Sequence, residues 1–228
     1  GHMFALMKKH PGVLVLHDFY LSNIVSHLDY LGVTSGAFAD ALYESHGYPA
    51  LIESKNTADV HQVIWKYPCS LGVIRSAQAV IVHSQFSKGL AKKWYGDSIA
   101  SSWSYIPHLR CLPEKFDQSE AKQKFGLEEG DFLVCAFGML GPSKLNHRLL
   151  KAWVDSGLAQ QKNCYLVFVG KNDGAQYGMD ILAQAKQAHC GERIKITGFA
   201  EAALFKQYLM AADAAMQLRT MSRGETSG

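Results

Sequence analysis

The sequence predicts an α/β protein of two domains, each built on a parallel sheet covered by helices. Short apolar runs recur along the chain, and such runs are typical of strands that are buried on both faces. Segments with a helical pattern separate them, and strands that alternate with helices form parallel sheets through right-handed crossovers. The alternation breaks off in a polar, charged stretch near residue 113 and then starts again. A chain of 228 residues is long enough for two such domains, each with its own core.

The first domain is expected to span residues 4–112. Its predicted elements are, in order, a helix end at 4–9, a strand at 13–16, a helix at 21–32, a helical stretch at 37–69 with breaks at 47–49 and 67–68, a helix at 71–78, a strand at 79–83, a helix at 85–95 and a short strand at 103–106. Ser84 directly precedes a helix and is expected to cap it, with a ligand contact as the alternative. Gly1-His2-Met3 resembles the remnant of an expression tag and is left out of the fold.

His17 follows the first predicted strand directly. In open parallel sheets ligands bind at the carboxyl ends of the strands, so this position favours a functional role. The alternative interpretation is structural, in which His17 caps a helix or completes a hydrogen bond in the core.

The second domain is expected to span residues 113–228. Its predicted elements are a short helix at 119–125, strands at 132–137, 164–169, 194–197 and 214–218, and helices at 146–156, 178–188 and 201–212. Each half is short of a complete Rossmann-type unit.

Composition excludes several classes of protein. The net charge of +3 is too small to indicate a nucleic-acid partner, and the apolar fraction of 48% is ordinary for a globular protein. No apolar run approaches the roughly 20 residues that span a bilayer, and no signal peptide is visible. The five cysteines are scattered without metal-ligand spacing, which predicts reduced, buried thiols in a cytoplasmic protein.

The loop after the first strand of the second domain has the composition of a phosphate site. Gly138 lets a ligand approach the backbone, and Lys144 is expected at the start of the following helix, where it adds a positive charge to an already positive helix terminus. The alternative is that Lys144 is a solvated surface lysine. The loop matches neither the Walker A pattern nor G-x-G-x-x-G, so a nicotinamide or flavin cofactor is not expected.

Three further loops leave the same edge of the predicted sheet. They contain Gly170 and Lys171 after the second strand, Gly198 and Phe199 after the third, and the run Arg219 to Gly228 after the last. Small and charged loops gathered on one edge predict a nucleotide site. A carboxylate would be repelled by phosphate, so Glu225 suits sugar hydroxyls instead.

These motifs together resemble the GT-B glycosyltransferases, in particular the large retaining group called family 4. The resemblance covers nearly the whole chain. Its motifs are HPGVLVLHDFYL, AVIVHSQFS, CAFGMLGPSK, YLVFVGK, IKITGF, AADAAMQLR and GETSG, in that order.

The resemblance implies a hexosyltransferase that moves a sugar from a nucleotide-sugar donor to a glycan or lipid-linked acceptor with retention, without a metal or other cofactor. The donor would bind mainly to the second domain and the acceptor to the first, in polysaccharide or glycoconjugate synthesis. His17, Lys144 and Glu225 are the expected catalytic residues. The expected donor-binding residues are Gly138, Gly170, Lys171, Gly198, Phe199, Arg219, Thr226, Ser227 and Gly228.

The sequence departs from the family pattern at two places. Met139 stands where the family has an arginine, so Arg219 or Lys171 is expected to supply the second charge for the diphosphate. Of the family's two glutamates, separated by seven residues, Glu225 matches the first, and the second would fall beyond Gly228. We therefore expect a piece of a longer protein, with little or no transferase activity.

Two other functions stay open at this point. One is a nucleotide-sugar epimerase of the same fold, and the other is a non-catalytic nucleotide-binding or scaffold module. Uncovered strand edges predict a tendency to form homo-oligomers. The aromatic and lysine residues of 88–95 suit peripheral contact with the inner face of a membrane, although a solvated helix face explains them as well.

Overall fold

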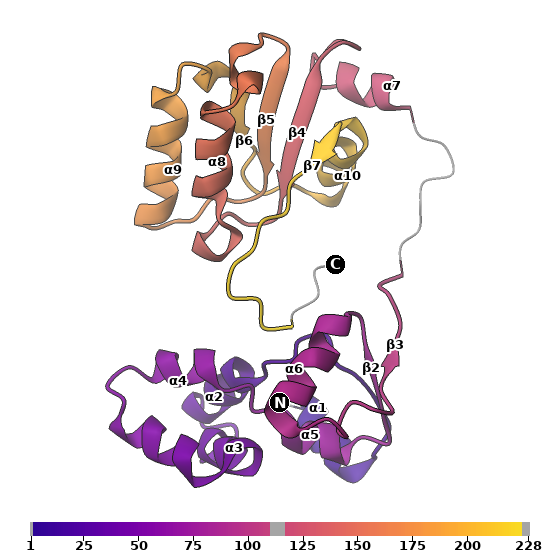
Figure 1. Ribbon diagram of the computed structural model, residues 1–228, viewed down its shortest axis with the longest axis vertical. Coiled ribbons are helices and arrows are strands. Elements are labelled where there is room, and N and C mark those ends of the chain that lie inside the picture. Colours follow the sequence, from indigo (N-terminus) through magenta and orange to yellow (C-terminus); the bar gives the residue numbers. More distant parts are fainter. Residues whose placement is uncertain (1, 110–116, 225–228) are drawn as a thin grey trace. The chain divides into compact units, whose positions relative to one another are not determined.

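The computed structural model describes residues 2–109 and 117–224. The chain divides into two compact units, of which unit 1 comprises residues 1–110 with 222–228 and unit 2 comprises residues 111–221. Both units are α/β, and their strands pair in parallel (Figure 1). The predicted α/β fold with parallel sheets is confirmed. The boundary expected at residue 113 falls within 110–116, outside the described residues.

Unit 1 contains a three-stranded sheet in the order β1-β2-β3. Its strands are β1 (Val13–Val15), β2 (Ala79–Val82) and β3 (Ser104–Tyr105). The ladder extends past the strand ends, because the Leu16 N–H donates to the Ile81 carbonyl (2.9 Å) and the Ile106 N–H donates to the Val82 carbonyl (3.0 Å). The carboxyl ends of all three strands therefore meet at one edge.

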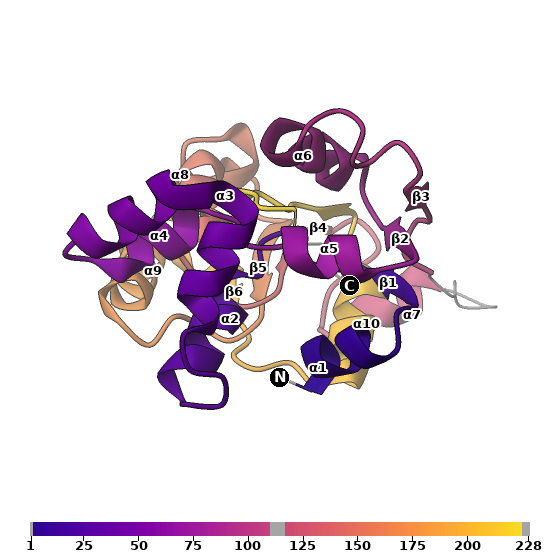
Figure 2. The same cartoon turned by 90° about the horizontal axis from the view of Figure 1, so that it is seen from below.

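Six helices belong to unit 1 among its described residues. They are α1 (His2–Lys9), α2 (Ser22–Tyr30), α3 (Ala37–Asn56), α4 (Val60–Lys66), α5 (Leu71–Ser76) and α6 (Gln85–Tyr95). Figure 2 shows α2, α3 and α4 gathered to one side of the strands, around a core of their own. The predicted break at Gly47 is a kink in α3, where Gly47 has φ 71°. Ser84 caps α6 as expected, because its Oγ accepts from the Ser87 N–H (3.3 Å).

A half-buried histidine makes the stability of unit 1 depend on pH. The His46 Nε2 accepts the Cys69 N–H (3.3 Å), and the ring packs against Tyr67 and Trp94 at centroid distances of 4.8 and 5.1 Å. Burial lowers the pKa of His46 from its ordinary 6.5 to about 4. The unfolded chain therefore binds a proton between these two values that the folded unit excludes.

We expect the free energy of unfolding of unit 1 to be complete above about pH 6.5 and to fall as the pH drops toward 4. The loss should be on the order of 1–2 kcal/mol once partial exposure is discounted. Urea unfolding across this range measures it. His46→Gln keeps an acceptor for the Cys69 N–H and should remove the fall in the free energy of unfolding between pH 6.5 and 4. His61→Gln on α4 should leave that pH dependence unchanged. An unchanged slope in His46→Gln would contradict the assignment.

Unit 2 contains a four-stranded parallel sheet in the order β6-β5-β4-β7. Its strands are β4 (Phe132–Phe137), β5 (Cys164–Val169), β6 (Ile194–Ile196) and β7 (Ala214–Ala215). The strand predicted at 214–218 is shorter than expected. Its pairing with β4 ends at Cys135, whose carbonyl accepts from the Met216 N–H (2.8 Å), and the chain then leaves the sheet.

Helices cover both faces of this sheet. They are α7 (Gln118–Gln123), α8 (Asn146–Val154), α9 (Gln176–Gln187) and α10 (Ala202–Ala211), with short 3-10 turns η1 (Pro142–Lys144), η2 (Gly157–Gln160) and η3 (Gly191–Arg193). Figure 1 shows α8 and α9 on one side of the strands and α7 and α10 on the other. The strand residues alternate between two cores, with Leu166 and Phe168 in one and Val167 and Val169 in the other. This alternation explains why β5 is apolar throughout.

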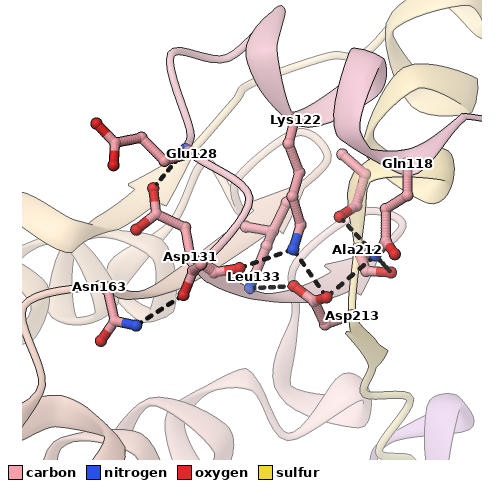
Figure 3. Close-up of polar contacts among 10 residues, drawn as sticks. Gln118, Lys122, Glu128, Asp131, Leu133, Asn163, Ala212 and Asp213 are labelled. Carbon is pink, nitrogen blue, oxygen red and sulfur yellow. Dashed lines mark hydrogen bonds and ion pairs between the residues drawn. The ribbon is translucent and has the colours of Figure 1, made fainter.

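A polar network ties α7 to the start of β4 and β7 (Figure 3). The Lys122 Nζ donates to the Asp131 carbonyl (2.7 Å) and pairs with the Asp213 Oδ1 (2.9 Å), and the Lys122 side chain is only 6% exposed. The Asp213 Oδ2 accepts the Leu133 N–H (2.7 Å), and the Gln118 amide donates to the Asp213 Oδ1 (3.1 Å). The network therefore provides partners for a buried charge at the amino edge of the sheet.

Four of the five cysteines are among the described residues, and all four are free and buried: Cys69, Cys135, Cys164 and Cys190. Burial raises the pKa of Cys69 and of Cys135 to about 12, so both thiols stay protonated at neutral pH. In the part of the chain that the structure describes, no helix has the length and apolar character to cross a membrane.

Candidate functional site

Three of the loops singled out in the second half, and the start of the fourth at Arg219 and Thr220, lie together at the carboxyl edge of the unit 2 sheet. Three backbone hydrogen bonds join the first loop to the second and to the fourth. The Gly138 N–H donates to the Val169 carbonyl (3.0 Å), the Leu140 N–H to the Lys171 carbonyl (2.9 Å), and the Thr220 N–H to the Ser143 carbonyl (2.9 Å). The loops are thus a connected rim rather than independent turns.

Gly138 and Lys144 form the part of this rim that most resembles a phosphate site. Gly138 has φ +101°, a conformation that side chains disfavour, and a Cβ built on it would lie 3.9 Å from the Lys144 Nζ. The lysine amine therefore reaches back over the bare glycine backbone. An anion at this point would meet a cation and an unobstructed main chain.

Lys144 does not lie at the start of the next helix as the sequence suggested. It ends η1, and Leu145 follows with φ 53° before α8 begins at Asn146. The side chain of Asn146 turns back to accept the Gly141 N–H at its Oδ1 (3.0 Å), which fixes the turn. The loop geometry, rather than the first turn of α8, thus positions the amine.

Gly170 is where two of the loops touch. A Cβ there would stand 2.1 Å from the Gly138 carbonyl oxygen, so glycine is required by contact with backbone. The Gly170 N–H donates to the Thr197 Oγ1 (3.0 Å), which connects the second and third loops. Lys171 and Phe199 are exposed, the latter by 73%, and Gly198 between Thr197 and Phe199 has φ +77°.

Arg219 is exposed in the last loop of unit 2, one residue before the Thr220 contact with Ser143. Glu225, Thr226, Ser227 and Gly228, which carry the expected donor motif, lie outside the described residues. Their assignments stay predictions.

In unit 1, His17 lies at the carboxyl edge of the sheet with its side chain 52% exposed. It does not cap α2, because the N-cap position is Leu21 without a side-chain cap bond. Its Nδ1 lies 3.5 Å from the Asp18 Oδ1. An exposed histidine at a strand end fits the functional interpretation better than the structural one.

Two further histidines, not singled out from the sequence, lie beside His17. The ring centroid of His108 is 5.4 Å from that of His17 and 4.1 Å from that of His83, with the second pair stacked. His83 ends the strand predicted at 79–83, and His108 lies two residues after the strand predicted at 103–106, so their convergence could have been inferred from parallel pairing. We refer to His17, His83 and His108 as the histidine trio.

The last described residues of the chain, up to the first glycine of the expected donor motif, pack within unit 1. The Arg223 guanidinium lies over the Trp65 ring at 3.8 Å and near the Tyr20 ring at 5.6 Å. The Gly224 carbonyl accepts from the Ser87 Oγ (3.2 Å). We refer to Ser222–Gly224 as the docked segment.

Unit 1 also has a cavity of about 560 Å³ between α1, α2, α3 and α5. Its lining includes Phe4, Val25, Ala41 and Val73 and contains none of the predicted site residues. Within 2–109 and 117–224, no group of three or more His, Cys, Asp or Glu side chains is placed to hold a metal ion.

No protein-family model matches the chain, and no curated protein does. Solved structures do match. HepE of Anabaena in complex with UDP has 21% identity and a TM-score of 0.58 over 96% of this chain and 49% of its own. HepE in complex with UDP and glucose has 25% identity and a TM-score of 0.52 over 69% of this chain and 42% of its own.

WaaG, a glycosyltransferase involved in lipopolysaccharide biosynthesis, has 16% identity and a TM-score of 0.55 over 93% of this chain and 52% of its own. The chain thus spans about half the length of the solved proteins that it matches. The fold is that of the GT-B glycosyltransferases. These likenesses leave the retaining mechanism and the family 4 assignment as predictions.

Proposed function

We propose that the chain is part of a glycosyltransferase that uses a nucleotide-sugar donor. The observation that carries the proposal is the connected rim of unit 2, in which the Lys144 amine lies over the bare backbone of Gly138. The likeness to HepE, whose structure holds UDP and glucose, supports a uridine diphosphate sugar as the donor class.

In this mechanism the leaving group is a nucleoside diphosphate, whose negative charge grows as the glycosidic bond breaks. Lys144 balances that charge, and backbone N–H groups around Ser227 and Gly228 add hydrogen bonds. Met139 leaves the family's second cation to Arg219 or Lys171. His17 contacts a donor-sugar hydroxyl or the developing positive centre, and Glu225 holds other sugar hydroxyls.

The proposal includes the finer expectations of the resemblance. The sugar is a hexose, transferred with retention to a glycan or lipid-linked acceptor, without a metal or other cofactor. The setting is polysaccharide or glycoconjugate synthesis in the cytoplasm, at the inner face of the membrane. Gly170, Gly198, Phe199 and Thr226 complete the donor site.

Replacing Lys144 by Ala tests the site. We expect the chain to bind UDP or GDP and the variant to bind it at least about tenfold more weakly, a loss of roughly 1.4 kcal/mol, because one cation facing the diphosphate is gone. Isothermal titration calorimetry with both nucleotides measures the affinities.

Lys162 provides the matched control. It is an exposed lysine of the same unit, but it precedes β5 and so lies at the opposite, amino edge of the sheet. Lys162→Ala should leave the affinity unchanged. Equal affinities in the wild type and Lys144→Ala, or equal losses in both variants, would reject the site. A failure to bind either nucleotide would reject the proposed function.

A further inference from the structure

Asn146 is a buried polar side chain of the unit 2 rim that the proposed mechanism does not use. It begins α8, two residues after Lys144, and is only 6% exposed. Its Oδ1 accepts the Gly141 N–H (3.0 Å). Because a backbone N–H can only donate, this contact fixes the orientation of the amide, with the oxygen on Gly141 and the NH2 group left for another partner.

The NH2 group of Asn146 is an open pair of donors. Within the described residues, the side chain makes no hydrogen bond other than that to Gly141, and its nitrogen is not closed off from solvent. Polar groups of buried residues normally have hydrogen-bond partners. An open NH2 group on a side chain that is otherwise buried therefore points to a ligand that accepts hydrogen bonds.

The two other asparagines of unit 2 use their NH2 groups within the protein. The Asn172 Nδ2, in the second loop of the rim, donates to the Gly178 carbonyl (3.0 Å). The Asn163 Nδ2, just before β5 at the amino edge of the sheet, donates to the Gly130 carbonyl (2.8 Å). Both asparagines are thus structural, and Asn146 differs from them in having its donors available.

The backbone around Asn146 is largely occupied by contacts within the protein. The Lys144 N–H donates to the Gly141 carbonyl (2.9 Å), and the His147 N–H donates to the Tyr177 Oη (3.1 Å). These groups would otherwise be the first donors that an anion meets before α8. A phosphate held at the Lys144 amine therefore depends on side-chain donors at this point of the rim.

The surroundings of the NH2 group favour a negatively charged acceptor. Helix α8 begins at Asn146 and has no acidic residue in its first turn, so the positive end of the helix is not neutralised there. A Cβ built on Gly141 would meet no atom within 4 Å, so the space beside the contact between Gly141 and Asn146 is open. Donors in such a setting are suited to the oxygens of a phosphate.

We propose that the Asn146 amide donates a hydrogen bond to a phosphate oxygen of the nucleotide-sugar donor. This inference rests on the proposed function, because it adds a contact to the leaving group that Lys144 balances. The amide is neutral, so it strengthens a site in which Met139 stands where the family has an arginine.

The direct test follows the side-chain NH2 signals of the chain by NMR, assigned with triple-resonance spectra. On titration with UDP, we expect the Asn146 pair to shift and to saturate at the dissociation constant that calorimetry gives. Uridine, which has no phosphate, should leave the Asn146 pair in place, and the Asn163 pair should not move with either ligand. An Asn146 pair that stays in place while UDP saturates the chain would overturn the inference.

Asn146→Asp provides the matching variant. It keeps an oxygen for the Gly141 N–H but replaces the NH2 group by a second oxygen, which repels phosphate. We expect an unchanged urea midpoint, a loss of UDP affinity of at least about tenfold and an unchanged affinity for uridine. Asn163→Asp makes the same change of charge at the amino edge and should bind UDP like the wild type. Equal UDP affinities in the wild type and Asn146→Asp would refute the contact; if the variant does not fold, the NH2 signals of the wild-type chain decide.

The outcomes separate this inference from the proposed function. If Lys144→Ala weakens UDP binding while the Asn146 pair does not respond to UDP, the function stands and this contact is lost. If neither nucleotide binds, the proposed function is rejected, and inorganic pyrophosphate then tests the amide by itself. A saturable shift of the Asn146 pair with pyrophosphate would keep the phosphate contact, and no shift would overturn it.

Discussion

Replacing Lys122 by Ala should lower the free energy of unfolding of unit 2 by about 3–5 kcal/mol, because it leaves the Asp213 carboxylate without its charged partner. The Asp213 side chain is 19% exposed, so little solvent replaces the lost Nζ. The Leu133 N–H and the Gln118 amide still contact the carboxylate, which favours the lower end of that range. Hydrogen exchange of the β4 amides, followed by mass spectrometry, measures the loss within unit 2.

Lys124 offers a control two residues away. Its Nζ pairs with the Glu120 Oε1 at 3.0 Å, but the two side chains are 48% and 65% exposed. Lys124→Ala should therefore change the stability by less than about 0.5 kcal/mol. Combining Lys122→Met with Asp213→Leu should recover most of the loss, since both charges are then removed. Similar exchange rates in the Lys122 and Lys124 variants would show that the network does not stabilise the unit.

Replacing Gly170 by Ala should destabilise unit 2 by at least about 3 kcal/mol and weaken nucleotide binding with it. The added Cβ would stand 2.1 Å from the Gly138 oxygen, 2.5 Å from the Gly138 carbonyl carbon and 3.2 Å from the Met139 nitrogen. All three atoms are backbone, so no side-chain rotation relieves the clash, and the Gly138 loop must move. Urea unfolding and UDP titration of the same preparation measure the two effects.

Gly174 in the same loop separates the clash from the change of residue type. A Cβ there meets no atom within 4 Å, and its φ is not positive. Gly174→Ala should therefore keep both the stability and the nucleotide affinity of the wild type to within about 0.5 kcal/mol. If Gly170→Ala behaves in the same way, the packing of the two loops is looser than the structure shows.

The sequence predicted the regular elements of unit 2 best where both faces of a strand are buried. The predicted strands at 132–137 and 164–169 have the bounds of β4 and β5, because continuous apolar runs end abruptly at Gly138 and Gly170. The strand at 214–218 was overestimated, since its apolar pattern continues after the pairing with β4 has ended. An apolar run in the sequence predicts that a segment is buried, but the length of a strand is set by how far it pairs with the adjacent strand.

Residues that depend on distant partners were harder to predict. Lys122 and Lys124 are equivalent in a charged stretch, and the contacts of Lys122 with the Asp131 carbonyl and with Asp213, 91 residues away, distinguish them. The contacts of Arg223 with Trp65 and of Gly224 with Ser87 have no local pattern at all. The histidine trio was easier to predict than these contacts, because all three histidines lie at the ends of expected parallel strands, which meet at one edge of a sheet.

The docked segment also lowers the conformational entropy that unit 2 has when it unfolds. The polypeptide leaves unit 1 at residue 110 and rejoins it at residue 222, so unit 2 is an insertion into unit 1. With the docked segment in place, unit 2 unfolds into a loop that is closed at both ends, and a closed loop has fewer conformations than a free tail of equal length. Arg223 stacks on Trp65, and Gly224 packs so closely that a Cβ built on it would lie 2.7 Å from the Phe19 Cβ and 2.9 Å from the Leu90 Cδ1. These two contacts in unit 1 thus oppose the unfolding of unit 2.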